Sequence, residues 1–220
     1  MSLLEIRIAL VLGLLVAGIT PAQAESAATA LSVIEQQVTK GRAAKTGYTR
    51  AQFGPEVSKA DFDRNGCETR NDILRRDLTN LVFSEKTRPC TVTSGTLIDP
   101  FSGEIINFVR GASTSKEVEI DHLVALSNAW QTGAFKLSIK ERTAFANDPM
   151  NLLAVKGRLN SQKGDGDAAT WLPPLKSFRC DYVSQQIAVK LKYKLWFTAP
   201  EKEAMIRILK SCPEKVLPKG

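Results

Sequence analysis

VEIDHLV at residues 118–124 and NLLAV at residues 151–155 are the two stretches that decide how this chain folds. Each is typical of a short strand, and the polar segment GRLNSQKGD at residues 157–165 is placed to begin a helix at about Asn160. The order of the three segments predicts a hairpin of two antiparallel strands with a helix packed across it. The most reactive side chains of the chain lie at the end of the first strand.

His122 is the single histidine of the sequence, and it directly follows Asp121. Successive side chains of a strand point to opposite faces, so Asp121 and His122 are expected to have different neighbours. If the helix crosses the hairpin, Asp121 and Asn160 can direct oxygens at one hard cation, while His122 faces a water beside a phosphate. A neutral imidazole can take the proton of that water. These parts are sufficient for phosphodiester hydrolysis.

Helices are expected on both sides of this unit. Apolar residues at helical spacing predict helices over residues 26–38 and 72–82, and a short helix is expected at residues 138–146. Near the C-terminus, Val183, Ile187 and Leu191 mark one helix. Another begins with TAPE at residues 198–201, a capping box with proline in the first turn.

A second pair of strands is expected at residues 90–98 and 104–110, which are rich in Thr, Val, Ile and Phe. The DPFSG segment between them has the chemistry of a hairpin loop. The predicted fold class is therefore α+β, with a small antiparallel sheet and C-terminal helices.

Residues 1–24 have the organisation of a signal peptide: Arg7, an uncharged run over residues 8–19, and an A-x-A site ending at Ala24. A membrane anchor is the alternative, but the apolar run is shorter than the ~20 residues that a spanning helix needs. Cleavage after Ala24 leaves residues 25–47 as an N-terminal helix and linker, loosely attached, and residues 48–220 as one domain. We expect a secreted protein without stable membrane association.

Four cysteines form an even set, which in an exported chain predicts two disulfides. Three pairings are open, and proximity in sequence favours Cys67 with Cys90 and Cys180 with Cys212. Zinc is not favoured, because the chain has no C-x-x-C pair and its histidine lies elsewhere.

The chain is basic, with a formal net charge of +7. Basic exported proteins meet polyanions such as nucleic acid, teichoic acid or anionic lipid. The positive charge raises the rate of association with any of these and does not indicate which one is bound.

DFDRNG at residues 61–66, followed by Asp72 at the twelfth place, partly matches a calcium-binding loop. The final ligand is Asp rather than Glu, and Cys67 interrupts the loop. An Asx-rich turn before a helix is the favoured interpretation, with calcium binding as the alternative.

Three segments together resemble the HNH, or His-Me finger, nuclease signature: IDHLV at 120–124, DPMNL at 148–152 and NSQKG at 160–164. The more similar branch is the secreted bacterial and fungal one related to the C-terminal domain of GmrSD-type restriction enzymes. The resemblance covers roughly residues 48–212. Further shared motifs are DRNGC at 63–67, TRND at 69–72, SGTL at 94–97, NAW at 128–130 and DAATWLPP at 167–174.

The resemblance implies a ββα-metal core in which His122 is the general base and Asp121 and Asn160 hold a divalent metal. It further implies that Asn151 fixes the loop that presents the histidine. Asn160 stands where the H-N-H pattern has its last histidine. An amide oxygen there suits an ion such as magnesium, with manganese and calcium left open.

Each of these residues has a structural alternative. Asp121 could end the strand or orient the imidazole, Asn151 could cap a turn after Pro149, and Asn160 could be a helix N-cap. Lys163 is the candidate phosphate ligand, with a solvated lysine as the alternative, and Arg110 and Arg158 are weaker candidates. The tryptophans are expected in the core rather than stacked on bases: Trp130, Trp171 and Trp196.

The sequence therefore predicts an exported metal-dependent endonuclease acting on DNA, with RNA as an open second substrate. Little sequence preference is expected, because no base-reading element is recognisable. The alternative is a non-catalytic extracellular module that binds a polyanion or calcium, and a third hypothesis is a toxin with an immunity partner. A pure binding module has no need of an imidazole beside a metal site, which favours the enzyme.

Overall fold

The computed structural model describes residues 28–86 and 90–219. The predicted signal peptide at residues 1–24 lies outside this part of the chain. Within the described part, no helix is both long enough and apolar enough to cross a membrane. Helices there combine with small antiparallel sheets, which confirms the α+β class.

The centre of the fold is an antiparallel pair of strands, β4 (Val118–His122) and β5 (Leu152–Lys156), followed directly by helix α5 (Gly157–Lys163). The helix begins three residues earlier than expected, so Asn160 lies inside it rather than at its start. Its first residue has to be glycine, because a Cβ at Gly157 would lie 2.0 Å from the Lys116 carbonyl oxygen. The predicted order of strand, strand and helix is confirmed.

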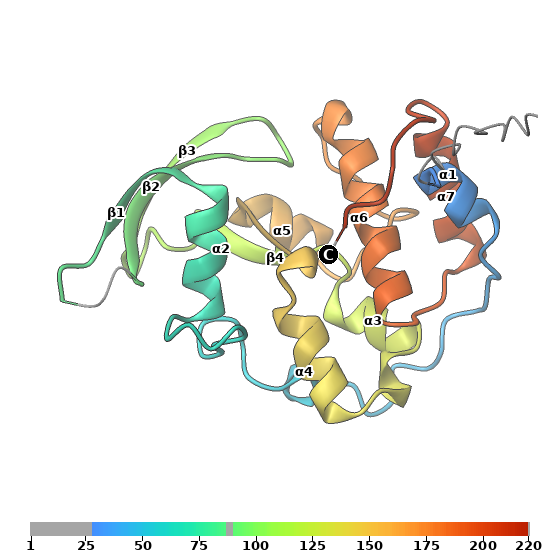
Figure 1. The fold of residues 1–220 in the computed structure, drawn as a ribbon, viewed down its shortest axis with the longest axis horizontal. Coiled ribbons are helices and arrows are strands. Elements are labelled where there is room, and N and C mark those ends of the chain that lie inside the picture. The colour runs from blue at the N-terminus through green and yellow to red at the C-terminus, as the bar shows by residue number, and fades with distance from the viewer. Residues whose placement is uncertain (1–27, 87–89, 220) are drawn as a thin grey trace, which may run out of the picture.

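A second sheet has the order β1 (Thr79–Phe83), β2 (Val92–Ile98) and β3 (Ile105–Val109). The predicted hairpin is confirmed, with Ile98 opposite Ile105 and all pairings antiparallel. This sheet curves away from the rest of the molecule beside helix α2 (Thr69–Asp77) (Figure 1).

The predicted helix over residues 72–82 is wrong in its second half. Helix α2 spans Thr69–Asp77, and the chain then enters β1, where Thr79 pairs with Thr96 of β2. The spacing of Leu74, Leu78 and Leu81 favours a helix locally, but pairing with β2 satisfies the backbone and overrides that preference.

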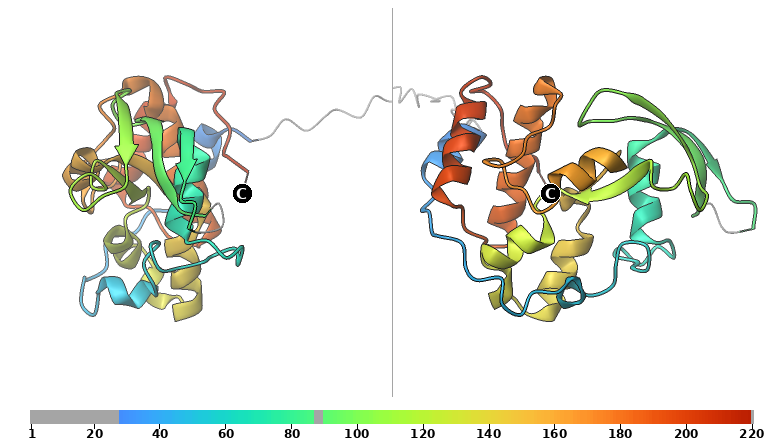
Figure 2. Two further views of the ribbon diagram at one scale, coloured as in Figure 1. Left: turned by 90° about the vertical axis from the view of Figure 1, so that its left-hand side faces the viewer. Right: turned by 180° about the vertical axis from the view of Figure 1, so that it is seen from behind.

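Three helices gather at the opposite end from this sheet (Figures 1 and 2). They are α1 (Ala30–Glu35), α6 (Arg179–Lys192) and α7 (Ala199–Leu209), and α7 has the predicted capping box. Ala30 and Ile34 are fully buried, so the N-terminal helix is packed into the core, contrary to the expectation of a loose attachment.

Short helices complete the fold below the central strands in Figure 1. Helix α4 (Ile139–Asn147) matches the prediction, whereas α3 (Leu126–Gln131) was not predicted. Short 3-10 turns lie at Arg50–Phe53, Ala134–Lys136, Pro149–Asn151 and Lys176–Phe178.

The central strands and the two residues that follow β4 belong to three clusters of buried apolar side chains. Leu123 and Val155 belong to the cluster of the C-terminal helices, Val124 to a cluster around Phe145, and Ile120 to the cluster under the β1–β3 sheet. Packing on several sides fixes the position of β4 and of the polar side chains at its end. Trp130 is buried in the cluster around Phe145 and half-buried Trp171 packs against the cluster of the C-terminal helices, as predicted, whereas half-buried Trp196 belongs to none of the three clusters.

Both disulfides favoured by proximity are present. Cys67–Cys90 joins the turn before α2 to the segment before β2, and Cys180–Cys212 joins the start of α6 to the segment after α7.

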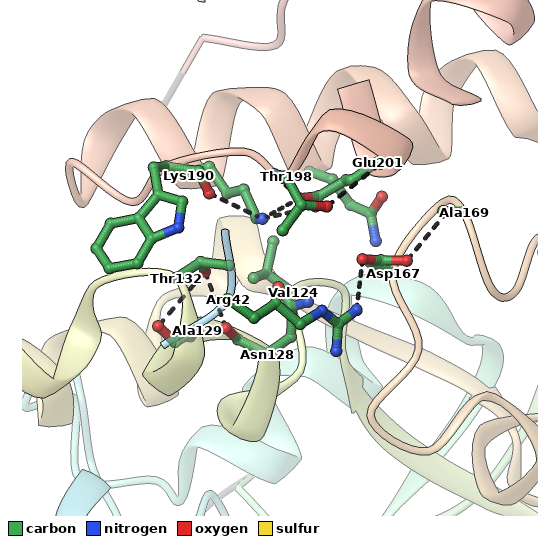
Figure 3. Close-up of polar contacts among 12 residues, drawn as sticks. Arg42, Val124, Asn128, Ala129, Thr132, Asp167, Ala169, Lys190, Thr198 and Glu201 are labelled. Carbon is green, nitrogen blue, oxygen red and sulfur yellow. Dashed lines mark hydrogen bonds and ion pairs between the residues drawn. The ribbon is translucent and has the colours of Figure 1, made fainter. Parts of the chain in front are cut away.

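Two ion pairs, one of them fully buried, lie around the C-terminal helices and the N-terminal segment (Figure 3). Lys190 and Glu201 are fully buried and 2.6 Å apart, and Arg42 contacts Asp167 at 2.6 Å. Desolvation by burial lowers the pKa of Lys190, while the Glu201 carboxylate raises it. The first pair joins α6 to α7, and the second joins the N-terminal segment to the loop after α5.

Candidate active site

Strand β4 directs Asp121 and His122 to different neighbours, as predicted from the pleat. Asp121 faces α5, where its Oδ1 accepts a hydrogen bond from the Lys163 ammonium at 2.8 Å. His122 faces the end of α4, with its Nε2 2.8 Å from the Ala146 carbonyl oxygen. The two strands pair antiparallel but are not a hairpin as predicted, because α3 and α4 lie between them in the chain. The strand pair places the acid and the imidazole on opposite faces of β4.

The contact with Ala146 fixes the tautomer of His122. A carbonyl oxygen can only accept a hydrogen bond, so Nε2 carries the proton and the lone pair of the neutral ring is on Nδ1. Burial lowers the pKa of His122 to about 4, against the opposing effect of the Ala146 hydrogen bond. The imidazole is therefore neutral at pH 7, with Nδ1 able to accept a proton.

Asn151 links the loop after His122 to the end of α4. It is fully buried, its Oδ1 accepts from the Val124 amide at 2.8 Å, and its Nδ2 donates to the Phe145 carbonyl at 3.5 Å. Asp148, not Asn151, caps the turn at Pro149–Asn151. These bonds connect the segment after His122 with the helix whose Ala146 contacts the imidazole.

Asn160 and Glu119 form a pair beside Asp121. The Asn160 Nδ2 donates to the Glu119 carboxylate at 2.8 Å. Because a carboxylate only accepts hydrogen bonds, this contact fixes the amide and turns the Asn160 Oδ1 away from Glu119. Glu119 was not singled out from the sequence, although its position two residues before Asp121 on one strand face is a signal that could have found it.

Asp121 has the properties of a cation ligand with one oxygen still free. The residue is 3% exposed, and its Oδ2 has no hydrogen-bond partner in the described part of the chain. A buried anionic oxygen without a partner is costly unless a cation or donor binds it.

The donor set fits a hard divalent cation. Over residues 28–86 and 90–219, no group of three or more His, Cys, Asp or Glu is arranged to hold a metal. Magnesium, however, is commonly bound through one or two protein oxygens, with water and substrate phosphate as further ligands. Asp121 and the Asn160 Oδ1 suit such a site.

Two cavities adjoin His122. The larger, of about 650 Å³, is lined by residues that include Arg50, Arg70, Glu119, His122 and Asn160. The smaller, of about 210 Å³, is lined by Asp121, His122, Asn160 and Arg50 among others. Three of the four main residues predicted from the sequence therefore share one cavity, and Asn151 supports it from the interior.

The three cations predicted to bind phosphate do not lie free at these cavities. Lys163 is fully buried, where it contacts Asp121 and donates to the His122 carbonyl at 2.7 Å. Arg110 donates to Asn71 at 2.6 Å and lines neither cavity. Arg158 is exposed on α5 and lines neither cavity.

The acidic turn before α2 is exposed and bonded within itself. The Asn65 amide contacts Asp61 at 3.1 Å and Asp63 at 3.2 Å, and its side chain donates to Asp72 at 3.1 Å. Gly66 adopts a φ of 89°, which glycine tolerates. The predicted Asx-rich turn before a helix is confirmed.

Residues 68–208, from the start of α2 into α7, match the model of the C-terminal domain of GmrSD restriction endonucleases. The chain belongs to this family. The GmrSD_C match includes β4, β5, α5 and every predicted site residue. It relates the chain to a nuclease-associated domain of restriction enzymes.

The relatives of this GmrSD_C chain include a protein of Arthroderma benhamiae named "Uncharacterized secreted protein". The two are 35% identical over 195 residues, which cover 88% of this chain and 89% of the relative. No solved structure matches the chain.

Proposed function

We propose that this chain is an exported, metal-dependent endonuclease that hydrolyses phosphodiester bonds of DNA, with His122 as the general base. One observation carries the proposal: His122, held through Nε2 by the Ala146 carbonyl, lines one cavity with Asp121, a buried carboxylate whose Oδ2 has no hydrogen-bond partner among the described residues. The family supports the reaction class, since its description names restriction endonucleases. Two disulfides and the relative named as secreted support export.

The chemistry assigned to His122 is proton transfer. Its Nδ1 takes a proton from water as the water oxygen bonds to phosphorus and the bond to the leaving oxygen breaks. The Ala146 carbonyl orients the ring through Nε2 and stabilises the positive charge that the imidazole gains. Asn151 holds the adjoining loop against α4, which keeps this geometry fixed.

Asp121 and Asn160 would hold the divalent cation, magnesium being the expected ion. When bound, such an ion supplies positive charge that polarises the phosphate and stabilises the leaving oxygen. Glu119 assists by keeping the Asn160 amide in the orientation that leaves its oxygen free. Lys163 neutralises part of the charge of Asp121 from the side of α5.

The test is nicking of supercoiled plasmid by the purified protein, with magnesium and with a chelator, beside His122→Ala. We expect metal-dependent nicking and a loss of about 10²–10⁴-fold in rate in His122→Ala, the usual range for a general base. Circular dichroism checks that the variant is folded. A wild-type protein that binds plasmid but never cuts it with magnesium, manganese or calcium would support the binding module instead.

A further inference from the structure

The two cavities beside His122 share a wall that carries one arginine. Arg50 opens the 3-10 turn Arg50–Phe53 and lines both the 650 Å³ and the 210 Å³ cavity, together with His122 and Asn160. Among the described residues it is the one cation that lines both. A phosphate placed next to the imidazole would therefore lie within the reach of this side chain.

Arg50 is exposed, and its side chain has no hydrogen bond or ion pair with any residue of the described ranges. Of the other cations near the site, Lys163 contacts Asp121 and Arg70 donates to the Val118 carbonyl at 3.0 Å. The exposed Lys59 lines the larger cavity but not the smaller one. Arg50 thus has its hydrogen-bond donors available for a ligand.

The acids that face these cavities are mostly paired with groups other than Arg50. Asp165 contacts Lys45 at 2.8 Å, Glu119 accepts from Asn160, and Asp121 pairs with Lys163. Glu56 is the further acid of the larger cavity, whose basic residues are Arg50, Lys59 and Arg70. The balance of charge in the larger cavity therefore favours an anion.

The backbone that carries Arg50 is firmly attached. Phe53 is buried in the cluster around Phe145, and the Gln52 carbonyl accepts from the Arg142 guanidinium at 2.7 Å. A side chain on an anchored turn loses less freedom on binding than one on a loose loop.

We propose that Arg50 is a nucleic-acid-binding residue that contacts a backbone phosphate beside His122, and that its turn forms one wall of the substrate groove. A guanidinium matches phosphate with two parallel hydrogen bonds, which a lysine cannot reproduce. The inference deepens the proposed nuclease function and rests on it for the nature of the ligand. It assigns to Arg50 the role that the sequence suggested for Lys163, Arg110 and Arg158.

The experiment measures binding of a short DNA duplex in chelator, where no cleavage is expected, over a range of salt concentrations. The variants are Arg50→Ala, Arg50→Lys and Arg207→Ala. Arg207 is a matched control, because it is an exposed arginine on α7 that lines neither cavity. Thermal unfolding checks that each variant is folded.

Arg50→Ala is expected to weaken binding about 10-fold or more, the range for a hydrogen bond to a charged group. The slope of log affinity against log salt should fall by about one, as for a lost phosphate contact. Arg50→Lys should be intermediate, and Arg207→Ala should leave affinity unchanged. Equal binding and equal cleavage kinetics in Arg50→Ala and Arg207→Ala would overturn the inference.

Cleavage assays with magnesium separate this inference from the proposed function. If the wild type cuts DNA and Arg50→Ala cuts it with unchanged KM and kcat, the role of Arg50 is refuted while the nuclease stands. If the wild type never cuts but loses duplex binding in Arg50→Ala, the nuclease is refuted while Arg50 remains a phosphate-binding residue.

Discussion

The acidic residues of β4 and those of the turn at residues 61–72 both have the spacing of oxygen ligands, yet their environments are opposite. Asp121 is 3% exposed, and one of its oxygens has no hydrogen-bond partner among residues 28–86 and 90–219. Asp61 and Asp63 are exposed and accept hydrogen bonds from Asn65 and Gly66. Water and these bonds satisfy the carboxylates of the turn, whereas the interior leaves Asp121 with a free anionic oxygen.

The difference teaches that spacing of carboxylates is weak evidence for a cation site. The turn at residues 61–72 has more acids than β4, but the local backbone already uses their oxygens. At β4, the Asp121 carboxylate is buried, so removing a hydrogen-bond partner from either of its oxygens costs much free energy of unfolding. Substitutions at Asp121 or its partner should therefore change stability and activity much more than substitutions in the turn at residues 61–72.

The largest effect on stability is expected from Lys163→Met, which leaves the Asp121 carboxylate buried without its partner. Removing one member of a buried ion pair costs about 3–5 kcal/mol in free energy of unfolding. The matched control is Lys45→Met, because the Lys45–Asp165 pair is exposed and such pairs contribute about 0–1 kcal/mol. Urea denaturation measures both, and equal losses would mean that Asp121 is better solvated than its burial indicates.

An intermediate loss in the free energy of unfolding is expected when the pH is lowered. The pKa of His122 is about 4 in the folded protein and near 6.5 when unfolded, so the unfolded state binds the proton first. The neutral ring contributes stability above the unfolded pKa, and this contribution falls as the pH decreases from about 6.5 to about 4.

Unfolding of wild type and His122→Gln between pH 7 and pH 4 measures the stability part of this prediction. The wild type should lose more stability than the variant. In the nuclease assay, the acid limb of the wild-type rate should lie well below pH 6.5. An acid limb near pH 6.5 would show that His122 titrates like an exposed histidine.

The smallest effect is expected from Asp61→Asn in the exposed turn. An asparagine keeps an oxygen for the Gly66 amide, and the Asn65 amide, which loses Asp61, still contacts Asp63 and solvent, so stability should change by no more than about 0.5 kcal/mol. Asp121→Asn is the comparison, and it should abolish most metal-dependent nicking.

If added calcium raises the melting temperature of the wild type but not of Asp61→Asn, the turn at residues 61–72 binds calcium. The proposed difference between this turn and the Asp121 site would then be wrong.

Much of the central unit was predictable because its signals are local. Alternation along β4 placed Asp121 and His122 on opposite faces, and the helix after β5 brought Asn160 to the Asp121 side. The prediction of a helix was wrong for residues 79–82, which form strand β1 paired with β2. The apolar spacing of this segment is helical, and its pairing with a distant strand cannot be recognised from the segment alone.

The sequence by itself determined the residue types at the site, the order of strand, strand and helix, and the disulfides favoured by proximity. The tertiary structure decided which charges are buried and which are free. Lys163 is enclosed with Asp121, while Arg50, distant in sequence, lies open beside His122. Burial and pairing of charge depend on contacts between distant segments, so no local pattern of residues could have specified them.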